Sequence, residues 1–117
     1  MRPTVLIVDD HAAFRESASA LLEAEGFDVI GEAADGEAAI AETKRLRPEI
    51  VLVDIQLPGL DGFDVAELLA GTGDAPAVVL ISSRDAAAYG SRVAEAPVRG
   101  FLAKRSLSGA ALAGFVQ

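Results

Sequence analysis

The sequence predicts an α/β fold: a doubly wound, five-stranded parallel sheet in the order 2-1-3-4-5 with five helices. Short aliphatic runs alternate five times with helical patterns, at intervals of roughly 20 to 27 residues. Such alternation favours parallel strands joined by helices that cover both faces of the sheet. Connections between parallel strands are right-handed, which leaves few possible strand orders.

The strand expected at Ile50–Asp54 is the central one. It contains four aliphatic residues without a polar break, ends at a carboxylate and is followed closely by turn residues. Runs of this kind are typical of strands buried on both faces. The other expected strands are Thr4–Val8, Val29–Ala33, Ala77–Ile81 and Gly100–Ala103. For such a sheet we expect the flavodoxin-like strand order.

A helix is expected after each strand. The first begins near Phe14 and ends at Gly26. Pro48 stops the second, because the residue before a proline disfavours helix. Asp61 is a candidate N-cap for the third, and Gly90 weakens the fourth. The bounds expected for the last four helices are Glu37–Leu46, Phe63–Ala70, Asp85–Glu95, and Ser106 or Ser108 to about Val116.

The composition indicates one globular domain, residues 1–117, with a net charge of −8. This charge argues against direct binding of nucleic acid by the domain. No apolar run reaches the roughly 20 residues needed to span a membrane. The chain has no cysteine, and its first residues lack the pattern of a signal peptide, so we expect a cytoplasmic protein.

Reactive residue types stand where the expected strands end: Asp9 and Asp10, then Asp54, Ser82 and Lys104. The carboxyl ends of parallel strands lie along one edge of a sheet, where ligands bind. Three carboxylates gathered there repel one another unless one is protonated or a cation binds. Oxygen ligands favour a hard divalent ion, so we expect Mg²⁺ rather than zinc, which prefers thiolates and clustered imidazoles.

Asp54 beside such an ion is equipped to attack a phosphoryl group and hold it as an acyl phosphate. Mg²⁺ and Lys104 would spread the charge of the transferring group, and Ser82 would donate a hydrogen bond to a phosphoryl oxygen. His11 is the only histidine and is expected to be an exposed residue in the first helical turn. The phosphoryl donor should therefore be a different molecule.

Five motifs carry these residues in order: Val8-Asp9-Asp10, Val53-Asp54, Leu57-Pro58-Gly59-Leu60-Asp61-Gly62, Ile81-Ser82-Ser83 and Gly100-Phe101-Leu102-Ala103-Lys104. Together they resemble the receiver domain of two-component response regulators. The separations agree along essentially the whole chain: 44 residues from Asp10 to Asp54, 28 on to Ser82 and 22 more to Lys104.

The resemblance implies that Asp54 is the phosphoacceptor, assisted by Lys104 and Ser82. The implied Mg²⁺ ligands are Asp9, Asp10, Asp54 and the backbone carbonyl of Gln56. The implied partner is a histidine kinase or a phosphotransfer protein. Phosphorylation would switch the face formed by the fourth helix, the fifth strand and the fifth helix, which is also a possible homodimer surface. The sequence around Asp9-Asp10-His11 and Lys104-Arg105-Ser106 resembles receivers attached to helix-turn-helix transcription factors.

Phe101 stands where many receivers carry tyrosine. By the resemblance, this ring moves inward when Ser82 is drawn to the phosphoryl group, but phenylalanine cannot make the hydroxyl hydrogen bond that tyrosine makes. Gln56 and Arg84 flank the expected pocket and are candidates for tuning the lifetime of the phosphoryl group. Because the chemistry is on the domain itself, we expect a signalling domain and not an enzyme in the ordinary sense.

Other interpretations stay open. Asp9 or Asp10 can be the N-cap of the first helix, Asp61 is most simply a turn or cap residue, and Phe101 can be ordinary packing. A different function is an interaction module that works without phosphorylation. A Mg²⁺-dependent phosphatase is disfavoured because its pattern is Asp-x-Asp, and a flavodoxin because Asp9-Asp10-His11-Ala12 replaces its hydroxyl-rich phosphate loop.

Overall fold

The computed structural model describes residues 2–116, and the predicted sheet is confirmed: five parallel strands in the order β2-β1-β3-β4-β5. The strands are β1 (Thr4–Val8), β2 (Asp28–Ala33), β3 (Ile50–Asp54), β4 (Ala77–Ser82) and β5 (Gly100–Ala103). The α-helices are α1 (Ala12–Ala24), α2 (Gly36–Leu46), α3 (Gly62–Ala70), α4 (Arg92–Glu95) and α5 (Gly109–Val116). Two 3₁₀ turns accompany them, η1 (Ala86–Tyr89) and η2 (Lys104–Ser106).

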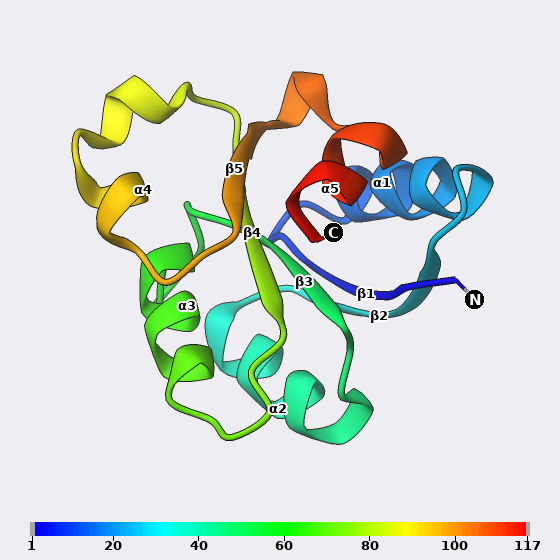
Figure 1. The fold of residues 1–117 in the computed structure, drawn as a ribbon, viewed down its shortest axis with the longest axis horizontal. Helices are drawn as coiled ribbons and strands as arrows, with labels where there is room; N and C mark the ends of the chain where they lie inside the picture. The colour runs from blue at the N-terminus through cyan, green and yellow to red at the C-terminus, as the bar shows by residue number, and fades with distance from the viewer. Residues whose placement is uncertain (1, 117) are drawn as a thin grey trace.

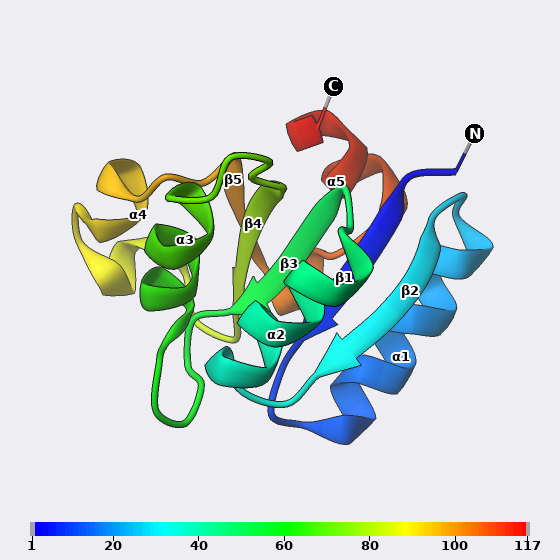
Figure 2. The same cartoon turned by 90° about the horizontal axis from the view of Figure 1, so that it is seen from below.

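The sheet lies between two layers of helices (Figure 1). α1 and α5 cover one face, and α2 and α3 cover the other (Figure 2). Side chains alternate between the faces along each strand. Ile7 and Leu52 therefore belong to the apolar cluster under α1 and α5, while Leu6 and Val53 belong to the cluster under α2 and α3. This double coverage explains the unbroken aliphatic runs of the central strands.

Side-chain caps begin two of the helices at the expected places. Asp61 accepts a hydrogen bond from the backbone N–H of Asp64 at 2.9 Å, and Asp64 accepts one from the N–H of Asp61 at 3.0 Å. This reciprocal pair is a capping box, which confirms Asp61 as the N-cap of α3. Of the two serines proposed for the last helix, Ser108 accepts the N–H of Ala111 at 3.0 Å.

The predicted single helix over Asp85–Glu95 is wrong. The chain forms η1, turns at Gly90 with φ 61°, and only then forms the single turn of α4. Glycine adopts such a left-handed conformation readily, whereas other residues do so at a cost. Between Ser83 and Gly90, Tyr89 is the only side chain that is not exposed.

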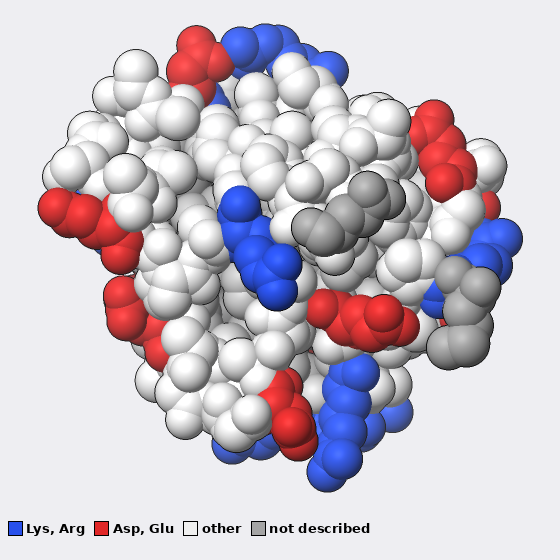
Figure 3. All heavy atoms as spheres, viewed as in Figure 1, with Lys and Arg blue, Asp and Glu red and all other residues white. Residues whose placement is uncertain are grey.

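The surface carries charges of both signs. Figure 3 shows acidic and basic side chains interspersed over one face, separated by broad areas of other residues. This face therefore offers no continuous basic surface to a nucleic acid. Among residues 2–116, none of the helices combines the length and the apolar character that crossing a membrane requires.

Gly62 packs against the end of β3. A Cβ atom added to Gly62 would lie 2.6 Å from the carbonyl oxygen of Asp54 and 2.7 Å from Cα of Ile55. Both are backbone atoms that cannot swing away. The Gly62 N–H also donates to the carbonyl of Ile55 at 2.9 Å. This close approach fixes the path of the chain directly after Asp54.

We expect Gly62→Ala to lower the free energy of unfolding by about 1–3 kcal/mol, as overpacking of a tight contact does. Gly73→Ala is the matched control, because nothing lies within 4 Å of a Cβ at Gly73. The control should change stability by less than about 0.5 kcal/mol. Urea unfolding followed by circular dichroism measures both variants. Equal stabilities would show that the chain relaxes around the new methyl group without cost.

Candidate functional site

The strands all end at the same edge of the sheet (Figure 2), and polar residues stand at the ends of four of them. Asp9 directly follows β1, Asp54 and Ser82 are the last residues of β3 and β4, and Lys104 directly follows β5. The register keeps these ends level, since Asp54 pairs with Ile81 on β4. Asp9, Asp54 and Ser82 are all buried.

Lys104 connects two of the acids. Its Nζ lies 2.5 Å from Oδ2 of Asp9 and 3.2 Å from Oδ2 of Asp54. The ammonium also lies over the ring of Phe14, 4.5 Å from the ring centroid. A cation–π contact of this kind helps to hold the side chain in place. Lys104 therefore compensates charge on both buried acids at once, and the positions of the three groups depend on one another.

Asp10 and His11 extend this group. One possible ligand atom from each of Asp9, Asp10, His11 and Asp54 lies within 4.8 Å of the others. His11 Nδ1 is 3.1 Å from Oδ1 of Asp9 and 3.0 Å from Oδ1 of Asp10. The His11 side chain is exposed, as expected, but its contact with both acids was not predicted. His11 also occupies the N-cap position of α1, so the interpretation of Asp9 or Asp10 as that cap is wrong.

Burial and charge act in opposite directions on the buried groups. Burial raises the pKa of Asp54, and Lys104 opposes this only in part. Burial acts to raise the pKa of Asp9 as well, but the contact with Lys104 and the backbone N–H of His11 hold it below its ordinary value. For Lys104, burial acts to lower the pKa, while Asp9 and Asp54 raise it above its usual value. Lys104 therefore stays charged, and Asp54 is the acid that burial disfavours as an anion.

The acids fit a hard divalent cation. Three carboxylates gather around one ammonium, so the ionised groups carry more negative than positive charge. Oδ2 of Asp9 is buried and makes no hydrogen bond of normal geometry, although Lys104 Nζ lies close to it. Oxygen ligands with unmatched negative charge suit Mg²⁺. The Gln56 backbone N–H donates to Oδ1 of Asp54 at 3.1 Å, and the role of its carbonyl stays a prediction.

The hydroxyl of Ser82 is directed toward the segment that follows β4. Its Oγ is 2.6 Å from the hydroxyl of Tyr89 and accepts the backbone N–H of Arg84 at 3.0 Å. The Tyr89 ring packs edge-on against Phe63, with centroids 5.8 Å apart, and lies 6.3 Å from the ring of Phe101. Sequence reasoning missed Tyr89, because no spacing rule links a loop residue to a strand end seven positions earlier.

Phe101 lies on β5 and is half-buried. It pairs with Leu80 on β4 and packs against the apolar cluster under α2 and α3. This position suits ordinary packing and also suits a ring that moves, so movement of Phe101 stays a prediction.

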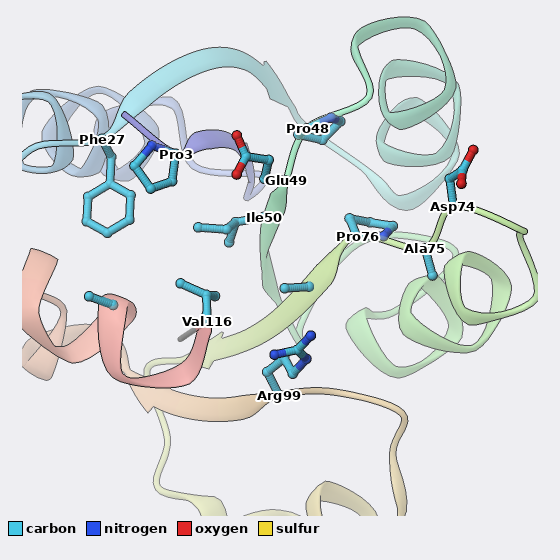
Figure 4. Close-up of a pocket in the computed structure, with 12 residues that line it drawn as sticks. Pro3, Phe27, Pro48, Glu49, Ile50, Asp74, Ala75, Pro76, Arg99 and Val116 are labelled. Atoms are coloured by element: carbon cyan, nitrogen blue, oxygen red, sulfur yellow. The ribbon is translucent and has the colours of Figure 1, made fainter. Parts of the chain in front are cut away.

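A cavity of about 550 Å³ lies at the opposite edge of the sheet (Figure 4). Ile50 and Pro76 line it where β3 and β4 begin, and Val116 lines it from the end of α5. Arg99 lies at its border, just before β5. No residue of the acidic group lines this cavity, so it is separate from the site at the carboxyl ends.

Comparisons with known proteins agree with this geometry. Residues 5–113 match the family model described as the response regulator receiver domain. Over 87 residues the chain is 41% identical to the DNA-binding response regulator MtrA of Mycobacterium tuberculosis, covering 73% of this chain and 37% of that protein. The signal receiver domain assigned to NarL of the same species has a TM-score of 0.86 at 32% identity, covering 97% of this chain and 96% of that one.

Another relative is named as an enzyme. The chain is 42% identical over 108 residues to a protein-glutamate methylesterase/protein-glutamine glutaminase of Anaeromyxobacter dehalogenans, covering 92% of this chain and 31% of that protein. This match overturns the prediction that the chain is not an enzyme. The physical reason is that the reactive residues at the strand ends belong to this domain alone. They do not distinguish a signalling protein from one part of an enzyme. The chain spans about a third of the length of these curated relatives.

We expect Asp54→Asn to raise the midpoint of thermal unfolding at neutral pH when divalent cations have been removed. Because the pKa of Asp54 is raised, its contribution to stability is present below the ordinary carboxyl pKa and is lost as the pH rises through the folded-state value. Asparagine does not ionise, so the advantage of the variant should grow between about pH 4 and pH 7. Differential scanning calorimetry in a chelating buffer measures this difference.

Adding Mg²⁺ should shrink or reverse that advantage, because a cation that uses the Asp54 carboxylate stabilises the wild type more than the variant. Asp74→Asn is the control, since Asp74 is exposed and lies outside the acidic group. It should match the wild type with and without Mg²⁺. An increase in the unfolding midpoint of Asp54→Asn that depends on neither pH nor Mg²⁺ would contradict the raised pKa of Asp54 and its part in a cation site.

Proposed function

Because this chain belongs to the family of response regulator receiver domains, we propose that Asp54 accepts a phosphoryl group from a histidine kinase or a phosphotransfer protein. The family supplies the class of reaction, and the residues supply the chemistry. The observation that carries the proposal is the position of one ammonium, Lys104 Nζ, 2.5 Å from Asp9 and 3.2 Å from Asp54.

The proposed reaction is a displacement at phosphorus. A carboxylate oxygen of Asp54 forms a new P–O bond, while the bond from phosphorus to the donor atom breaks and the donor keeps that electron pair. The product is an acyl phosphate, and its hydrolysis restores the carboxylate. The Gln56 N–H holds Oδ1 of Asp54 and Lys104 contacts Oδ2, so the nucleophile is oriented before the donor arrives.

The remaining residues of the site stabilise negative charge on the transferring phosphoryl group. Lys104 keeps its proton, since both acids raise its pKa, and it can neutralise an oxygen of the transferring group. Asp9, Asp10, Asp54 and the carbonyl of Gln56 are the proposed ligands of Mg²⁺. When bound, Mg²⁺ supplies further positive charge to the phosphoryl oxygens. Ser82 donates a hydrogen bond to one of these oxygens.

We propose that residues 1–117 act as one receiver domain in the cytoplasm. Phosphorylation would change the face formed by α4, β5 and α5, which is also the candidate surface of a homodimer. MtrA is named a DNA-binding response regulator. By analogy, a separate helix-turn-helix domain would contact DNA while this domain does not.

Acetyl phosphate with Mg²⁺, followed by intact-mass measurement, tests the proposal. The wild type should gain the mass of one phosphoryl group, and Asp54→Asn should gain none. Asp61→Asn is the matched control, because Asp61 caps α3 and asparagine caps helices equally well. It should gain the same mass as the wild type, and chelation of Mg²⁺ should suppress the gain in both.

A wild type that never gains this mass, or an Asp54→Asn variant that gains it, would remove the proposed phosphoacceptor. Beryllofluoride with Mg²⁺ then separates the receiver from an interaction module that works without phosphorylation. NMR shifts around Ser82 and Phe101 are expected for the receiver, whereas the interaction module should show none.

A further inference from the structure

We infer that Tyr89 is a positioning residue for Ser82, holding its hydroxyl away from the acidic group until a phosphoryl group is present. The inference rests on the proposed function and adds a residue that lies outside its five motifs. Tyr89 is the last residue of η1, and its hydroxyl is 2.6 Å from Oγ of Ser82.

The hydrogen-bonding capacity of Ser82 supports this role. A serine hydroxyl has one hydrogen to donate and two lone pairs that accept. The Arg84 N–H occupies one lone pair, and the Tyr89 hydroxyl occupies a second position. Among the described residues, the Ser82 hydroxyl bonds to these two partners and to neither Asp54 nor Lys104. Both partners lie in the segment that follows β4, so rotation of the Ser82 side chain toward a phosphoryl oxygen on Asp54 carries Oγ away from the Tyr89 hydroxyl and breaks that pair.

Tyr89 also anchors the segment between β4 and α4. It is the only side chain between Ser83 and Gly90 that is not exposed, and its ring contacts Phe63 on α3 and Phe101 on β5. Once Ser82 has turned away, the Tyr89 hydroxyl needs another partner, because a polar group without one is costly inside a protein. Tyr89 is half-buried, so an outward movement of its side chain together with η1 would give the hydroxyl water as its new partner.

The same movement affects Phe101, because the centroids of the Tyr89 and Phe101 rings lie 6.3 Å apart. Outward movement of Tyr89 opens space beside Phe101 on β5.

Intrinsic fluorescence tests the inference without a label, because the chain has one tyrosine and no tryptophan. Tyrosine emission depends on the hydrogen bonding of the phenol. Acetyl phosphate with Mg²⁺ should change the emission of the wild type in parallel with the gain of one phosphoryl mass in the same sample. Ser82→Ala should differ in emission before phosphorylation and should not change further. Ser83→Ala, at the exposed neighbour, should behave like the wild type.

Tyr89→Phe keeps the ring and removes only the hydroxyl. Ser82 is then free to turn, so the apparent affinity for beryllofluoride with Mg²⁺, measured by ¹⁹F NMR, should increase about two- to tenfold, the range expected for one ordinary hydrogen bond. In a Ser82→Ala background the same substitution should change the affinity by less than about twofold, because the partner hydroxyl is absent.

A wild type that gains the phosphoryl mass without a change in tyrosine emission overturns the role of Tyr89 and leaves the proposed function intact. A Tyr89→Phe variant whose beryllofluoride affinity is unchanged or weaker does the same. A wild type that gains no phosphoryl mass overturns the proposed function and this inference together.

Discussion

Three carboxylates lie at one edge of the sheet with a single ammonium, and the rest of the structure must offset the electrostatic repulsion among them. Lys104 contacts both buried acids, yet burial still raises the pKa of Asp54. Such a group is held together only by a rigid frame, which the buried strands β1, β3 and β4 provide. A ligand that changes the charge at this edge therefore changes the electrostatic interactions that hold the neighbouring loops in place.

The fold was predictable because its strongest signals are local. Buried parallel strands carry unbroken aliphatic runs, and Asp61 and Ser108 cap helices through neighbours three residues away. The segment Asp85–Glu95 was not predictable in the same way. Its alanine-rich composition suits a helix that Gly90 weakens, but the packing of the Tyr89 ring on Phe63 of α3 depends on a residue far away in the sequence.

The site also has a part that the sequence predicts and a part that it does not. Strand ends in a parallel sheet share an edge, which predicts the proximity of Asp9, Asp54, Ser82 and Lys104. Tyr89 and the Phe14 ring under Lys104 reach the site from helical segments, and periodicity does not report such contacts. His11 had one signal, its place directly after two acids.

The residues of the site come from positions 9 to 104, with Lys104 following the last strand. Contacts between such distant positions form slowly, because long loops must close first. Until β5 joins the sheet, the acids after β1 and at the end of β3 have no lysine beside them. A nascent chain on the ribosome, or a misassembled copy, would thus carry Asp54 without Lys104 beside it. The proposed phosphoryl transfer then becomes possible only in the completed domain.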